Sequence, residues 1–159
     1  MGIVNRRLGR YAEAEHHRGA VAIHREVDDL PGEGRALGNL GFVEMGLGAY
    51  DAAREHHTRS LEIHRERGDR ADEAVSLTNL GAVLERLGRY PEALDHHERA
   101  LAIYHDIGYR IGEADALHGI GIGIGVGIGI VRRRAGRPDQ ATDPLRDAIA
   151  TARESAKPT

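Results

Sequence analysis

The chain has 159 residues, of which 40% are hydrophobic and 30% are charged, with no cysteine and a formal net charge of −3. This composition permits a buried core, and it excludes a disulfide framework, thiolate chemistry and a global electrostatic attraction to nucleic acid or acidic membranes. The N-terminus lacks the apolar run of a signal peptide, and Arg6 stands where a myristoylation motif requires Ser or Thr, so we expect a soluble cytoplasmic protein.

The first predicted unit, residues 1–29, is a shortened copy of the forty residues that follow it. Gly2, Gly9 and Tyr11 recur thirty-nine positions later, whereas His17 recurs forty positions later. Because glycine often ends a helix, this pattern predicts the end of one helix, a turn at Gly9 and a second helix. The change of spacing indicates that one residue is missing after Ala14, in the middle of that second helix.

Two complete copies of one unit follow, at residues 30–68 and 69–108. Ten residues of the first copy meet the same residue type forty positions later in the second copy. They are Asn39, Leu40, Gly41, Gly48, Tyr50, Ala53, His56, His57, Leu61 and Ile63. Self-similarity at a fixed period of this size indicates a repeat architecture.

Each complete copy predicts two antiparallel amphipathic helices. Leu77, Leu80 and Leu84 fall on one helical face, Gly88 follows at a typical stop position, and Pro91 occupies a first-turn position where its missing N–H costs nothing. We therefore expect an all-α fold of stacked helix pairs.

Small residues and histidines recur where the paired helices should approach each other. Gly41 and Gly81 are small because a close helix–helix contact is expected there. His17, His57 and His97 occupy the packing position of the second helix, where a buried imidazole resists charging. We therefore expect acidification below about pH 6, under the ordinary histidine pKa of ~6.5, to loosen the fold.

A fourth unit, residues 109–159, is interrupted by glycine alternating with Ile or Val. Gly136 answers Gly88 at a spacing of forty-eight, which assigns residues 122–129 to an insertion. The tract lacks the Gly-Lys-Ser/Thr that closes a P-loop and the preceding strand that a dinucleotide-binding fingerprint requires. It is also shorter than the roughly 20 apolar residues of a membrane span, and as a β-strand it would be prone to aggregation. We interpret the tract as an expanded dipeptide. Because alternating glycine disfavours a helix, we expect a bulge or fraying unless neighbouring helices hold a longer helix.

No pattern in the chain indicates catalytic residues or a bound cofactor, so we expect a protein that is not an enzyme. The histidine pairs lack the i, i+4 spacing that chelates a metal ion within one helix, and we predict no metal site, although ligands between stacked helices stay open. The basic cluster of residues 132–137 could bind nucleic acid only through its charge, and we favour this alternative less.

The unit resembles the tetratricopeptide repeat in its longer form of about forty residues. Residues 69–108 carry the pattern through Leu77, Leu80-Gly81, Gly88-Arg89-Tyr90, Ala93, His97 and Ala100, and residues 30–68 through Leu37, Leu40-Gly41, Gly48-Ala49-Tyr50, Ala53, His57 and Ser60. His57 and His97 depart from the aromatic residue of the family. The resemblance implies an α-α superhelix, or solenoid, whose first helices line a concave groove that binds segments of partner proteins without catalysis.

The resemblance also implies which residues face the partner. Asn39 and Asn79 precede the Leu-Gly pair, and an Asn amide can hold a peptide backbone at both its donor and its acceptor. The expected cationic residues at the ends of the first helices are Arg6, Arg7, Arg86, Arg133 and Arg134. Such a groove should prefer acidic peptides. Gly38 and Phe42 replace the Lys and Asn with which chaperone-binding members clamp a C-terminal carboxylate, which argues against chaperone tails.

A second hypothesis concerns the context of the chain. Repeats of this length form the sensor arms of larger bacterial regulators, joined to an ATPase or DNA-binding domain, and the sequence is also compatible with a fragment of such a protein. Uncapped terminal repeats make self-association a further expectation. We predict a protein or peptide partner, with no membrane and no direct nucleic-acid contact.

Overall fold

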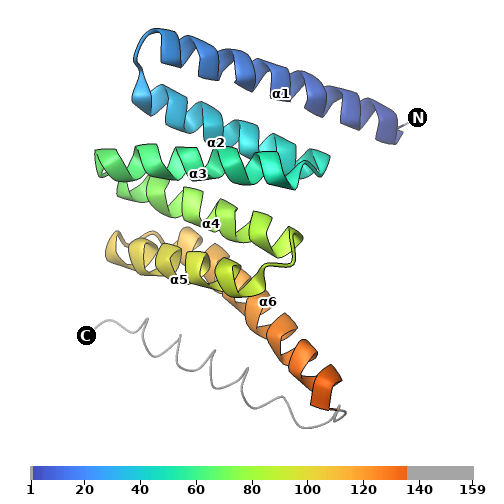
Figure 1. The fold of residues 1–159 in the computed structure, drawn as a ribbon. Helices are drawn as coiled ribbons and strands as arrows, with labels where there is room; N and C mark the ends of the chain where they lie inside the picture. The colour runs from blue at the N-terminus through green and yellow to red at the C-terminus, as the bar shows by residue number, and fades with distance from the viewer. Residues whose placement is uncertain (1, 136–159) are drawn as a thin grey trace.

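The computed structural model describes the backbone of residues 2–135 and the side chains of residues 7–125. Within that range the chain forms α-helices only, and consecutive helices pack against each other in a stack (Figure 1). The helices are α1 (Gly2–Glu26), α2 (Leu30–Leu47), α3 (Tyr50–Arg67), α4 (Arg70–Arg86), α5 (Tyr90–Asp106) and α6 (Arg110–Ala135). The predicted all-α solenoid is confirmed.

Glycines with positive φ mark the joins after α2, α3, α4 and α5. Gly48, Gly68, Gly88 and Gly108 have φ values of 84°, 72°, 75° and 70°, in the left-handed region that residues with a Cβ rarely adopt. At the first of these joins the N–H groups of Gly48 and Ala49 donate to carbonyls of the last turn of α2, so the helix end keeps its hydrogen bonds.

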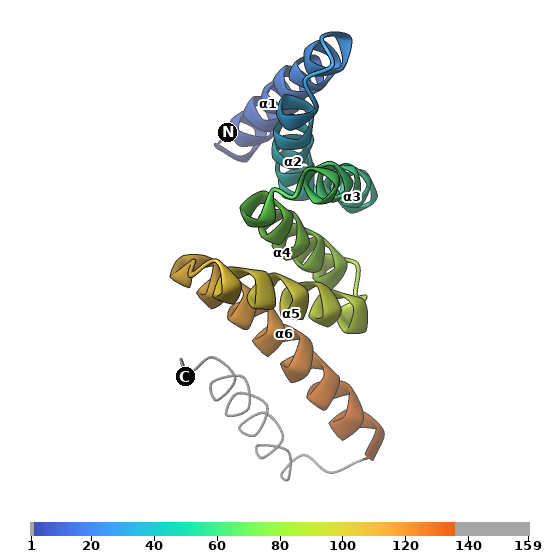
Figure 2. The ribbon, with the colours of Figure 1, turned by 90° about the vertical axis from the view of Figure 1, so that its left-hand side faces the viewer.

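The helices form two layers. In the described residues α4 contacts both α2 and α6, whereas α3 makes no close backbone contact with α1 or α5. The first helices of the pairs therefore converge on an inner face, and α1, α3 and α5 splay apart on an outer face. The helix axes also turn progressively along the stack (Figure 2).

The core lies between these layers, around α4. Leu77 and Leu80, predicted on one face of that helix, are buried together with Leu61 of α3, Ile103 of α5 and Ala116 of α6. Burying such aliphatic side chains supplies most of the favourable free energy of folding.

A contact between a basic residue and a glutamate links each unit to the next at the same place in the repeat. The basic side chain lies in the last turn of one helix, and the glutamate lies in the first turn of the next helix along the chain. The pairs are Arg25–Glu33 at 2.7 Å, Arg65–Glu73 at 2.9 Å and His105–Glu113 at 3.4 Å. Because all six positions keep the forty-residue period, the sequence carried this signal, although apolar periodicity does not show it.

The predicted turn at Gly9 is wrong, because α1 runs without a break from Gly2 to Glu26. At Gly48 and Gly88 a turn lets two long helices fold back on each other. Residues 2–8 make only about two helical turns, which offer little surface for such packing. A continuous helix keeps the backbone hydrogen bonds of this segment instead.

The predicted bulge in the Gly-Ile tract is also wrong, because α6 stays helical through residues 122–129 and ends at Ala135. Its first half lies along α5: a Cβ built on Gly123 would lie 3.7 Å from Leu94 Cβ and 3.8 Å from the Tyr90 carbonyl oxygen. Since Tyr90 begins α5, the rest of α6 extends past that helix (Figure 1). Packing against α5 offsets part of the cost of the glycines.

Candidate functional site

A hollow of about 320 Å³ on the inner face brings together the two predicted asparagines. Asn39 of α2 and Asn79 of α4 both line it, beside Phe42 and Val75. Phe42 is 62% exposed, which is unusual for a large aromatic residue. The hollow therefore offers amide groups and apolar surface side by side.

The floor of this inner hollow is polar, which was not predicted from the sequence. Ser60 Oγ donates to the Gly34 carbonyl oxygen at 2.8 Å and lies 3.2 Å from Ser76 Oγ. His64 also lines the floor, and its Nδ1 lies 3.9 Å from Asp72 Oδ2 without forming a hydrogen bond in the described part of the chain. Ser60 replaces the small apolar residue of the repeat, Ala100, and this difference was the available signal.

A second hollow, of about 590 Å³, brings together Arg7 of α1 and Arg86 of α4, which were both predicted to face the partner. Arg10 joins them, and its Nη1 donates to the carbonyl oxygen of Gly46. Any Cβ at Gly46 would lie 2.6 Å from Arg10 Nη1, so glycine makes room for this guanidinium. We call this the arginine hollow.

The arginine hollow is strongly cationic. Among the residues that the structure describes, no acidic side chain lines it, and Arg7 and Arg86 form no ion pair. The predicted Arg6, Arg133 and Arg134 have side chains outside the described residues. The arginine hollow is therefore built by Arg7 and Arg86, two of the residues predicted to face a partner, and by Arg10, which was not among them.

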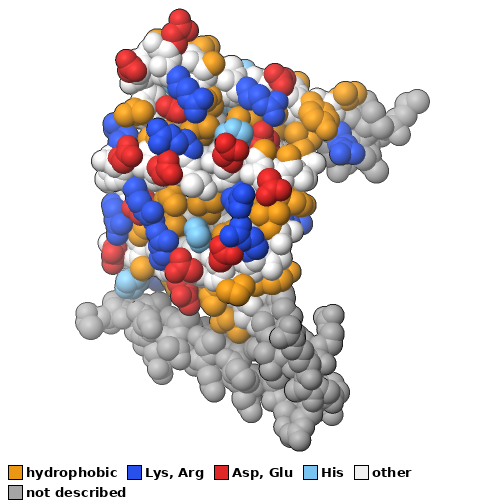
Figure 3. All heavy atoms as spheres, in the orientation of Figure 1, with side chains coloured by type: hydrophobic (Ala, Val, Ile, Leu, Met, Phe, Trp, Pro, Cys, Tyr) orange, Lys and Arg blue, Asp and Glu red, His pale blue; other side chains and the backbone are white. Residues whose placement is uncertain are grey.

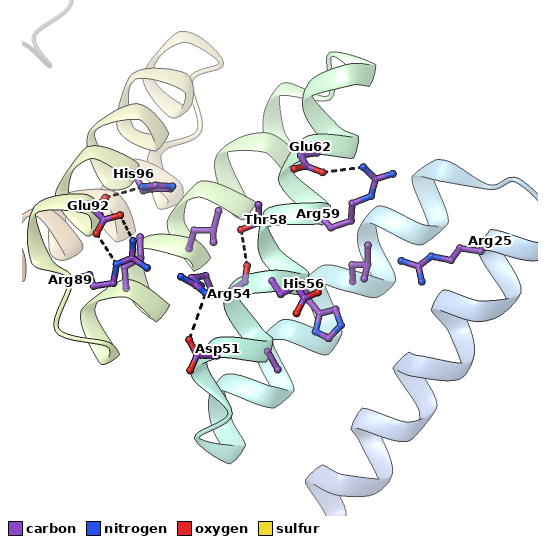
Figure 4. A pocket seen from close by; sticks show the side chains of 15 residues that line it. Arg25, Asp51, Arg54, His56, Thr58, Arg59, Glu62, Arg89, Glu92 and His96 are labelled. Carbon is purple, nitrogen blue, oxygen red and sulfur yellow. Dashed lines mark hydrogen bonds and ion pairs between the residues drawn. The ribbon is translucent and has the colours of Figure 1, made fainter.

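The outer face carries a third hollow, of about 1000 Å³ and thus larger than the other two, between α3 and α5 (Figure 4). Basic, acidic and histidine side chains are interspersed over this face (Figure 3). Most of the charged groups that line the hollow pair with a residue three positions away in the sequence. The pairs are Arg54–Asp51 at 3.7 Å, Arg59–Glu62 at 3.0 Å and Arg89–Glu92 at 2.5 Å. Because its charges already have partners, this hollow offers a ligand less than its volume suggests.

One buried carboxylate joins three helices beneath the outer face. Glu44 of α2 accepts from Arg18 Nη2 of α1 at 3.0 Å and lies 2.7 Å from His56 Nδ1 of α3. The equivalent residue in the next unit is Leu84. A buried glutamate needs such partners, so we assign Arg18 and His56 a structural role in stabilising Glu44 rather than a role in binding a ligand.

The predicted burial of the repeat histidines is confirmed for two of the three. His57 is 0% and His97 is 2% exposed, whereas His17 on α1 is only half-buried. Burial is the main cause that lowers the pKa of each buried imidazole to about 4, with a smaller contribution from His56 or His96 beside it. On α1 no preceding first helix covers His17, which explains the difference.

Two features of the described residues bear on other functions. Within this part of the chain, no group of three His, Asp or Glu side chains is placed to hold a metal ion. No helix there combines the length and the hydropathy needed to cross a bilayer.

Comparison with known proteins points to a repeat family. The family model of the tetratricopeptide repeat matches residues 1–66, 33–106 and 72–122, three overlapping stretches that together cover most of the chain. No curated protein sequence matches the chain.

Proposed function

The chain belongs to the tetratricopeptide repeat family, whose repeats are protein-interaction modules, and we propose that it binds an extended partner segment along its inner face without catalysing a reaction. One observation carries the proposal. Asn39 and Asn79, from two different repeats, line one hollow beside an exposed Phe42.

The chemistry of the inner hollow suits a peptide backbone. Each Asn amide offers two N–H donors and a carbonyl acceptor, which match the C=O and N–H groups of an extended chain. Phe42 and Val75 offer apolar surface to one side chain of the segment. Arg7 and Arg86 favour a segment with acidic residues, and that preference should weaken as salt rises.

Selection from a random nonapeptide display library tests the proposal. Binders should emerge, and the double variant Asn39→Ala/Asn79→Ala should bind them at least tenfold more weakly, because each lost hydrogen bond costs about 1 kcal/mol. Thr58→Ala in the outer hollow is the matched control and should bind normally. Binding that survives loss of both asparagines, or that depends on Thr58, would place the site elsewhere.

A further inference from the structure

The inner hollow and the arginine hollow lie along one continuous face. On α2 the residues of this face are Arg35, Asn39, Phe42 and Gly46, and on α4 they are Val75, Asn79, Ala82 and Arg86. Both sets follow the spacing +4, +3, +4 that keeps side chains on one side of a helix. The first three positions of α2 line the inner hollow, whereas Gly46, with Arg10 upon it, and Arg86 line the arginine hollow.

The separation of the two hollows is set by the helices themselves. Asn39 precedes Gly46, and Asn79 precedes Arg86, by seven residues each. At 1.5 Å per residue these steps correspond to roughly 10 Å along the helix axis. A peptide in the polyproline II conformation rises about 3.1 Å per residue and returns every third side chain to the same side, so a segment that spans both hollows covers this distance in about three residues.

The arginine hollow selects for negative charge. Arg10 already donates to the Gly46 carbonyl oxygen, so it offsets the partial negative charge at the end of α2. The neighbouring acid Glu85 faces His97, with 3.1 Å between Oε1 and Nε2, so no acid among the side chains of residues 7–125 pairs with Arg86. Arg7 and Arg86 are thus available, and a guanidinium binds carboxylate or phosphate oxygens through paired N–H donors.

We infer that the partner segment carries a large apolar side chain at the level of the asparagines and an anionic side chain three positions away. This inference rests on the proposed function, because it assumes that the segment lies in the inner hollow. The apolar residue contacts Phe42 and Val75, and the anionic group, a carboxylate or a phosphate, enters the arginine hollow.

Analysis of the selected nonapeptides is the first test. Asp or Glu should be enriched three positions from a large apolar residue in selections on the unmodified protein. Selections on the double variant Arg7→Gln/Arg86→Gln should keep the apolar residue and lose the acid. Arg99→Gln, at an exposed position on α5 outside the three hollows, is the matched control and should leave the enrichment unchanged.

Synthetic peptides give the second test and distinguish the two sources of charge. The most enriched nonapeptide is made with Glu, phosphoserine or Gln at the anionic position. Glu or phosphoserine should bind the unmodified protein at least tenfold more tightly than Gln, and this ratio should fall below twofold on Arg7→Gln/Arg86→Gln. Equal binding of all three peptides, still dependent on Asn39 and Asn79, would overturn this inference alone. A library without any binder would overturn the proposed function as well.

Discussion

The two complete helix pairs bury the same histidine in different surroundings. His57 of α3 lies against Gly41, and neither of its ring nitrogens has a hydrogen-bond partner in the described part of the chain. His97 of α5 lies between Gly81 and Gly119, and its Nε2 donates to Glu85 at 3.1 Å.

The residues that differ around the two imidazoles explain this contrast. Met45 stands in the second unit where Glu85 stands in the third, and Asn79 stands where α6 has Gly119. The repeat therefore conserves the contact between a small residue and a flat ring, whereas non-repeating neighbours decide whether the ring is hydrogen-bonded. An unpartnered buried polar atom costs free energy, so His57 should be the less favourable of the two sites.

Acidification should produce the largest effect, because it acts on both histidines. In the unfolded chain an imidazole has a pKa of ~6.5, whereas burial lowers the pKa of His57 and of His97 to about 4. Unfolding therefore takes up protons between these values. The contribution to stability is complete above pH 6.5, falls as the pH drops toward 4 and levels off below it. At pH 5 the loss is about 2 kcal/mol for each histidine.

Urea unfolding from pH 8 to pH 4 measures this loss. The groups that act on the two rings are His56 for His57, and His96, His118 and Glu85 for His97. His16→Gln on the exposed surface of α1 should leave the profile unchanged. A free energy of unfolding that stays flat over this range would show that neither ring is buried in solution.

Replacing Gly41 or Gly81 by alanine should give the second-largest effect, and the loss of stability should differ between the two histidine sites. A Cβ on Gly81 would lie 2.5 Å from the His97 ring, which Gly119 also confines, so the ring cannot move away. We expect Gly81→Ala to lower the free energy of unfolding by about 2–3 kcal/mol. A Cβ on Gly41 would lie 2.8 Å from His57 Nε2, and no other glycine up to Gly125 contacts that ring, so Gly41→Ala should cost about 1 kcal/mol.

Chemical denaturation of the two variants checks this order. Gly121→Ala is the matched control, because a Cβ there meets nothing within 4 Å, and it should stabilise the protein by up to about 1 kcal/mol through helix propensity. Equal costs at positions 41 and 81 would mean that Gly119 does not confine His97.

A reciprocal exchange of neighbours should give the smallest effect. Glu85→Met reproduces the second unit in the third and removes the hydrogen bond of His97, so the free energy of unfolding at pH 8 should fall by about 1 kcal/mol. Met45→Glu supplies a hydrogen-bond partner for His57 and should raise the free energy of unfolding by up to about 1 kcal/mol. Thermal melts at pH 8 measure both, with Glu98→Met on the exposed side of α5 as control. Shifts of the same sign would refute the role given to these neighbours.

Part of the candidate site could be predicted from the sequence, and part could not. Asn39 and Asn79 were placed on one face because both hold the same position in the repeat. Arg10 holds the repeat position of Arg89, and this position does not reveal that Arg10 lies over Gly46, which depends on how α1 crosses α2. Ser60 and Ser76 were missed because apolar periodicity shows which side of a helix is buried and not which polar atoms meet there.

The sequence by itself determined the helical repeat, the glycine joins such as Gly48 and Gly88, and the burial of His57 and His97. These features depend on backbone conformation and on side-chain periodicity, which act within one helix pair and repeat every forty residues. Only the tertiary structure decided that α1 continues past Gly9 and that α6 continues through residues 122–129. It also decided that Arg7, Arg10 and Arg86 meet in one hollow. The first outcome reflects the small surface that residues 2–8 offer for packing, whereas the other two depend on contacts between different helices, whose free energies outweigh local preference.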